Sequence, residues 1–184
     1  MCARTFAKNM KSLFLLLLIT ILPISNLSAE EEVDFANLNP QTVVKAINRF
    51  FDKPLSEEAD GYSSIIVNFA DASEDITISI GTDVLPWLED EGRSDMWLKV
   101  MAAYIGGNVA KQIELGEAKD SRGAGLKAQL KMYLKLRETE NLPKQATLER
   151  WSEMDIEKIL AEIDLAEKEK SEQDVSAKSD RSGG

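Results

Sequence analysis

The chain has 184 residues and a formal net charge of −10 at pH 7, from 32 acidic and 22 basic residues. It contains one cysteine, Cys2, and no histidine, which excludes Ser-His-Asp triads and every histidine-containing metal site. The acidic charge argues against nucleic acid and anionic lipid as partners, because both would repel the chain. No cofactor motif is present, so we predict no cofactor, no bound metal and no catalytic residue.

The N-terminal 29 residues have the pattern of a cleavable secretory signal peptide. An apolar run, residues 13–24, follows a positive segment and is too short to span a bilayer comfortably. The small residue Ala29 ends the segment, and a strongly acidic stretch begins at Glu30. We predict a signal peptide over residues 1–29; an uncleaved membrane anchor is the alternative. The positive charges before the apolar run are Arg4, Lys8 and Lys11.

Cleavage after Ala29 would change the composition of the protein. It would remove the only cysteine and three positive charges, which leaves a net charge of −13. An exported domain without disulfides is more typical of bacteria than of eukaryotic secretion. We therefore expect an exported protein, with the periplasm favoured over the extracellular space, and no stable membrane span after cleavage.

The first half of the remaining chain predicts a helix followed by a β-hairpin. Asn39 is a good N-cap before Pro40, so a helix is expected over residues 40–52. Apolar residues then alternate with polar ones over 62–70 and 75–80, which indicates two strands joined by a turn. A short helical segment is expected over 83–91.

The second half predicts a run of helices. The first covers 95–115, between Ser94 as cap and Gly116 as terminator. Further helices are expected over 124–138 and from Thr147 to about 168. Residues 169–184 are polar and cannot bury apolar area, so we expect a disordered tail. The predicted fold is a single, predominantly helical α+β domain over 30–168, with an N-terminal helix, a hairpin and three or four further helices.

The most specific candidate site lies in the helix expected over 95–115. Tyr104, Asn108 and Gln112 follow one another at four-residue spacing and share one helix face. A phenol beside two amides suits a polar ligand, whereas a satisfied hydrogen-bond seam between packed elements is the structural alternative. Gly106 and Gly107 lower helix propensity, which suggests that another backbone or a ligand packs closely against them.

Two further features are candidates. Trp97, with Trp87 before it, suits either a ligand groove or the core. Acidic residues cluster at the expected hairpin turn and before the long helix, where they could hold Ca²⁺ or serve a glycosidase, although solvated loops are the simpler interpretation. These acids are Asp71, Glu74, Asp75, Glu89, Asp90, Glu91 and Asp95.

These observations favour a small exported protein without catalytic activity that binds an envelope or secreted protein, or a small polar ligand. The preferred contact residues are Tyr104, Asn108, Gln112 and Trp97. A carboxylate-dependent hydrolase of cell-envelope or extracellular glycans is the alternative function. A chaperone-like or inhibitor module that pairs through the hairpin edge is a third hypothesis, and the oligomeric state is left open.

Overall fold

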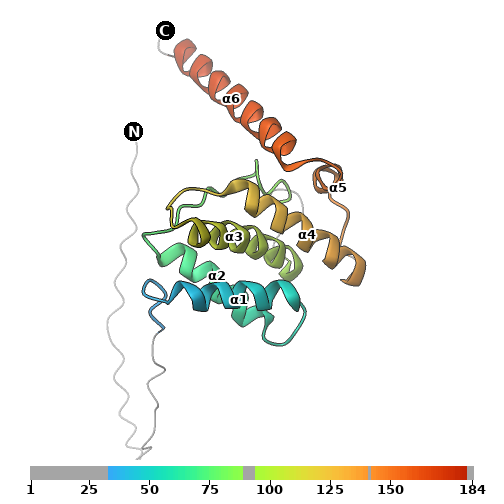
Figure 1. Cartoon of the computed structure of the whole chain (residues 1–184). Helices are drawn as coiled ribbons and strands as arrows, with labels where there is room; N and C mark the ends of the chain where they lie inside the picture. The colour runs from blue at the N-terminus through green and yellow to red at the C-terminus, as the bar shows by residue number, and fades with distance from the viewer. Residues whose placement is uncertain (1–32, 89–93, 141, 182–184) are drawn as a thin grey trace, which may run out of the picture. The chain divides into compact units, whose positions relative to one another are not determined.

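The computed structural model describes residues 33–88, 94–140 and 142–181, so the predicted signal peptide lies outside the described residues. Within these ranges the chain forms six α-helices and no strand (Figure 1). None of the described helices is long and apolar enough to cross a membrane. The helices are α1 (Pro40–Asp52), α2 (Ala59–Ala72), α3 (Asp95–Leu115), α4 (Arg122–Glu140), α5 (Ala146–Ser152) and α6 (Ile156–Arg181).

The predicted β-hairpin is wrong, and the described fold is helical instead of α+β. Residues 62–70 lie inside α2, and residues 75–80 form no strand. Tyr62, Ile66 and Phe69 face the core at helical spacing, with Ile66 and Phe69 buried. The dense run of apolar residues fits both a period of two and a period of 3.6. Packing of α2 against α1 and α3 overrides the β-propensity of its branched side chains.

The helices expected over 40–52 and 95–115 have the predicted bounds. The Asn39 side chain accepts a hydrogen bond from the Gln41 backbone N–H at 2.8 Å, which caps α1. At the end of α3, Gly116 has a left-handed backbone with φ of 67°, a conformation that glycine adopts without steric cost.

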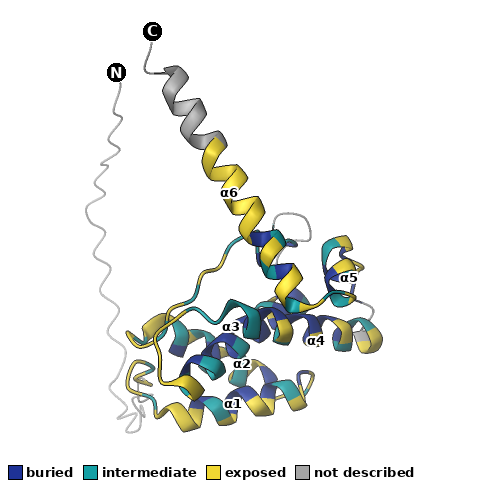
Figure 2. Cartoon of the chain, turned by 45° about the horizontal axis from the view of Figure 1, so that its top comes forward, coloured by how far each residue is buried: buried dark blue, intermediate teal, exposed yellow. Residues whose placement is uncertain are grey.

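Helix α3 is the centre of the core. It contacts α1, α2 and α4, and buried residues occur on all of its sides (Figure 2). A helix that is apolar all round must be enclosed by its neighbours. The polar side chains that are buried on α3, such as Asn108 and Gln112, therefore have to find their hydrogen-bond partners within the protein.

The segment between α2 and α3 contains turns in place of the short helix expected over 83–91. Residues 82–84 and 86–88 are turns, and residues 89–91 lie outside the described residues. Val84 and Leu85 are fully buried, so residues 83–88 lie against the core although they form no helix.

The last predicted helix is two helices. α5 ends at Ser152 and α6 begins at Ile156, and the cap of α5 is Gln145 instead of Thr147: the Gln145 side chain accepts from the Leu148 N–H at 2.8 Å. α6 continues to Arg181, past the expected domain end at 168. Its Glu, Lys and Ala residues are good helix formers, and residues 164–172 of the helix are exposed (Figure 2).

Candidate binding surfaces

The three polar residues predicted to form a contact face are buried in α3. Tyr104 and Asn108 are 0% exposed and Gln112 is 2% exposed. They stack along one face as their spacing predicts, and Gln112 Nε2 donates to Asn108 Oδ1 at 2.7 Å.

This face binds the chain segment that follows α2. Gln112 Nε2 donates to the Thr77 carbonyl at 2.8 Å, and Gln112 Oε1 accepts from the Thr77 N–H at 3.0 Å. Two residues later, the Tyr104 hydroxyl donates to the Ser79 carbonyl at 3.1 Å. Alternate residues of 75–80 thus bond to side chains of α3 in the way that alternate residues of a strand bond to a neighbouring strand.

The loop after α3 completes the same network. Asn108 Nδ2 donates to Asp120 Oδ1 at 2.6 Å, and Asn108 Oδ1 accepts from the Ser121 N–H at 2.9 Å. Asp120 Oδ2 also accepts from the Ser79 N–H at 3.2 Å. We call this network the α3 seam; it consists of Thr77, Ser79, Tyr104, Asn108, Gln112, Asp120 and Ser121.

The α3 seam uses its polar side chains inside the protein. Every side-chain nitrogen and oxygen of Tyr104, Asn108 and Gln112 has a partner in the described residues. Burial raises the pKa of Tyr104, and the Asp120 carboxylate raises it further, so the phenol stays a protonated donor. The predicted role of these three residues in ligand binding stays a prediction, since a ligand would have to replace these bonds.

The two glycines of α3 have different surroundings. A Cβ added to Gly107 would lie 2.5 Å from Ala128 Cβ and 2.6 Å from the Ala124 carbonyl oxygen of α4. A Cβ added to Gly106 would meet Ile66 and Ile47 at 3.5–3.6 Å, which is ordinary contact. A glycine of α4 makes the corresponding contact with α3: a Cβ added to Gly125 would lie 2.9 Å from the Tyr104 carbonyl oxygen. The close α3–α4 approach therefore depends on Gly107 and Gly125.

Trp97 and Trp87 belong to a buried aromatic stack. Both are 1% exposed; their rings stack with centroids 4.9 Å apart, and Trp97 also stacks on Tyr133 at 6.0 Å. The Tyr133 hydroxyl donates to Glu149 Oε1 at 2.6 Å. This bond, together with the ion pair from Arg137, lowers the pKa of Glu149.

The acidic clusters are solvent-exposed where they are described. Asp71, Glu74, Asp75 and Asp95 are exposed, whereas 89–91 lie outside the described residues. In the described part of the chain, no three acidic side chains are grouped to hold a metal ion. The described carboxyl groups with a shifted pKa all shift downward, which keeps them ionised and does not favour a general acid. They are Asp34, Glu58, Glu149 and Glu162.

Basic residues gather on two helices of this acidic chain. α1 and α4 carry seven of the 22 basic residues but only three acidic ones, Asp52, Glu138 and Glu140. Arg122 and Arg137 have acidic partners, whereas no ion pair occurs at the other five among the described residues. Those five are Lys45, Arg49, Lys127, Lys131 and Lys135.

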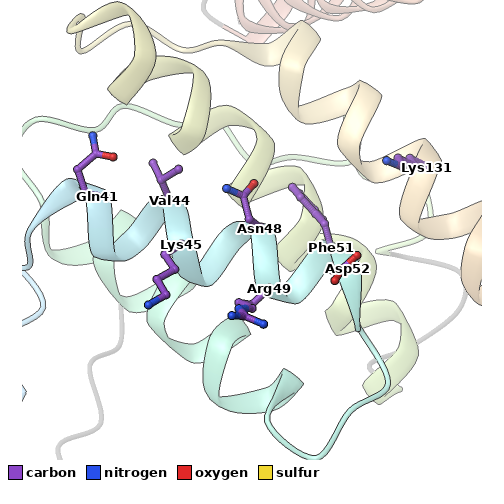
Figure 3. A pocket seen from close by; sticks show the side chains of 8 residues that line it. All are labelled: Gln41, Val44, Lys45, Asn48, Arg49, Phe51, Asp52 and Lys131. Atoms are coloured by element: carbon purple, nitrogen blue, oxygen red, sulfur yellow. The ribbon is translucent and has the colours of Figure 1, made fainter.

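Two adjoining pockets lie among these cations and together form what we call the α1–α4 groove. The smaller pocket, about 240 Å³, lies against α4 and the end of α1, and the larger, about 700 Å³, runs along α1. They share Phe51 and Lys131. The smaller is lined by Phe51, Ala124, Lys127, Ala128, Lys131, Met132 and Lys135. The larger is lined by Gln41, Val44, Lys45, Asn48, Arg49, Phe51, Asp52 and Lys131 (Figure 3).

One lysine joins the two helices at the end of the groove. Lys135 Nζ donates to the Phe51 and Asp52 carbonyls, at 3.1 and 2.8 Å, and so caps the C-terminus of α1. Sequence reasoning missed this groove, although one signal was present: Lys127, Lys131 and Lys135 recur at four-residue spacing.

Known proteins add nothing to this geometry. Comparison of the chain with protein families, with curated proteins and with solved structures gave no match.

Proposed function

We propose that this chain is an exported, non-catalytic binding protein that holds an anionic ligand, or an acidic site on a partner protein, in the α1–α4 groove. One observation carries the proposal: the groove is lined by four basic side chains that have no ion-pair partner in the described residues. They are Lys45, Arg49, Lys127 and Lys131. The α3 seam, by contrast, supports internal packing because its polar groups are already paired.

The contrast between local and total charge supports a compact anion as the ligand. Charges beyond a Debye length of about 8 Å at physiological salt are largely screened, so a ligand in the groove interacts mainly with the nearby cations. A long polyanion would also meet the acidic remainder of the surface and be repelled. The groove therefore favours a small anion or a single acidic site.

Calorimetric titration with inorganic phosphate, succinate and a hexaglutamate peptide tests the groove. We expect at least one of these probes to bind, more weakly at high salt, and to lose binding in Lys127→Ala/Lys131→Ala. The matched control is Lys168→Ala/Lys170→Ala, which removes the same charge from exposed positions of α6. Equal binding by both double variants, or no binding of any probe, would overturn the assignment of the groove.

Export is tested separately from binding. We expect the protein in the periplasmic fraction of a bacterial host, with Edman degradation reading Glu30 as the first residue. A chain that keeps residues 1–29 and sediments with membranes would favour the anchor alternative. A protein that remains in the cytoplasm would contradict export.

A further inference from the structure

The smaller pocket of the α1–α4 groove combines an apolar wall with a charged rim. Phe51 from α1 and Ala124, Ala128 and Met132 from α4 supply the apolar surface. The remaining lining residues are the three lysines of α4. A simple anion such as phosphate would use the rim and leave the apolar wall in contact with water.

The three lysines of α4 line one side of the smaller pocket. Lys127, Lys131 and Lys135 lie one turn apart, which places them along about 12 Å of helix. Lys135 is held by two carbonyl groups of α1, whereas Lys127 and Lys131 are exposed. Lysine stems add to an apolar wall while their ammonium groups stay at the water boundary.

Small side chains keep this pocket open. Ala124 and Ala128 are the α4 residues that approach Gly107 most closely, so their side of α4 is fixed against α3. Both alanines also line the smaller pocket, so the α4 wall carries short side chains between the lysines and Met132. The pocket therefore follows from the same close helix approach that Gly107 permits.

We infer that the ligand of the α1–α4 groove is an amphiphilic anion: a carboxylate or phosphate head on an apolar chain. The head pairs with Lys127 and Lys131, and the chain lies against Phe51 and Met132. This inference rests on the proposed function and narrows its ligand class. An amphipathic acidic helix fits less well, because it needs a long apolar trough, whereas the groove along α1 is lined mainly by Gln41, Lys45, Asn48 and Arg49.

Titration of the purified protein with single-chain probes tests the inference. Hexanoate, octanoate and decanoate, each below its micelle concentration, are compared with acetate and with decyltrimethylammonium. We expect affinity to rise by up to about fourfold for each methylene buried, until the pocket is full. The cationic probe should not bind, because it presents the same chain with the opposite charge.

Matched variants separate the head contact from the chain contact. We expect Lys127→Glu/Lys131→Glu to weaken decanoate binding by about tenfold or more, and Lys168→Glu/Lys170→Glu to leave it unchanged. Phe51→Ser should reduce the increase in affinity with the chain length of the probe. Leu165→Ser, at an exposed apolar position of α6, should leave that increase unchanged. None of these substitutions changes residues 1–32, so in chains that keep the apolar run at 13–24 any binding of a probe to that run would be equal in all variants.

A second measurement does not depend on the folding of the Phe51 variant. In the unaltered protein, the ε-methyl NMR signal of Met132, assigned with Met132→Leu, should shift with decanoate and not with acetate. Lysine-dependent binding of phosphate or hexaglutamate without any effect of chain length would overturn the inference and leave the proposed function standing. Lysine-dependent binding to anionic vesicles, without binding of monomeric decanoate, would overturn it in favour of a membrane surface.

Discussion

The α3 seam and the lysine row of the α1–α4 groove are built on the same four-residue spacing and have opposite environments. Tyr104, Asn108 and Gln112 are buried and hydrogen-bonded to other parts of the chain. Lys127 and Lys131 are exposed on α4 and have no ion pair within the described residues. Shared spacing therefore shows that residues lie on one helix face, but not what that face contacts.

The rest of each helix explains the difference. Most of α3 is enclosed by its neighbours, so the polar side chains buried on it must be satisfied internally. α4 has one exposed side, where lysine heads remain hydrated. A row of polar residues is thus a better binding candidate on a solvated helix face than on an enclosed one.

Substitution of Gly107 should have the largest effect on both regions, since it sets the distance between α3 and α4. We expect Gly107→Ala to lower the free energy of unfolding by about 3 kcal/mol, because the new methyl overlaps Ala128 and the Ala124 carbonyl. Gly106→Ala is the control and should change it by no more than about 1 kcal/mol. Urea denaturation measures both; equal effects would contradict the close approach at Gly107.

Removal of a side-chain amide from the α3 seam should cause the second-largest loss of stability. Asn108→Ala removes the bonds to Asp120, Ser121 and Gln112 in a buried site, so we expect a loss of about 2–3 kcal/mol in unfolding free energy. The same change at Asn48, exposed in the groove, should cost less than about 0.5 kcal/mol. Similar losses at the two asparagines would remove the distinction between the two regions.

Substitution of the partly exposed Glu149 should cause an intermediate loss of stability, and this loss should depend on pH. The folded-state pKa of Glu149 lies below its ordinary value, mainly because Tyr133 donates to it. Its stabilisation is therefore complete above about pH 4.3 and is lost as the pH falls through the folded-state pKa. Glu149→Gln should be less stable than the unaltered protein at pH 7, and the difference should shrink below about pH 4. A difference that grows in acid would contradict this sign.

Reversal of the free lysines should have the smallest effect on stability. Because Lys127 and Lys131 have no ion-pair partner in the described residues, Lys127→Glu/Lys131→Glu should change the unfolding free energy by less than about 0.5 kcal/mol. Thermal unfolding followed by circular dichroism checks this. A large loss would mean that these lysines support the fold and would weaken the proposal that they face a ligand.

Local signals predicted part of this molecule well. Caps and terminators at Asn39, Pro40 and Gly116 are short-range chemistry, so the bounds of α1 and α3 could be predicted from sequence. The shared face of Tyr104, Asn108 and Gln112 was also predictable, whereas its contact with Thr77 and Ser79 joins residues 25–35 positions apart. The apolar residues of α2 are so closely spaced that they fit the period of a strand as well as that of a helix, so their pattern alone does not predict a helix. The groove needed the placement of α1 beside α4, which no local pattern contains.

The lysine that caps α1 from α4 has a consequence for the order of folding. Lys135 lies 83–84 positions along the chain from the carbonyls that it bonds. Closing so long a loop is entropically costly, whereas the α3–α4 contact joins helices that are adjacent in sequence. We therefore expect α3 and α4 to dock first and the last turn of α1 to become ordered afterwards. In pulsed hydrogen exchange during refolding, amides at the end of α1 should be protected later than those of α3.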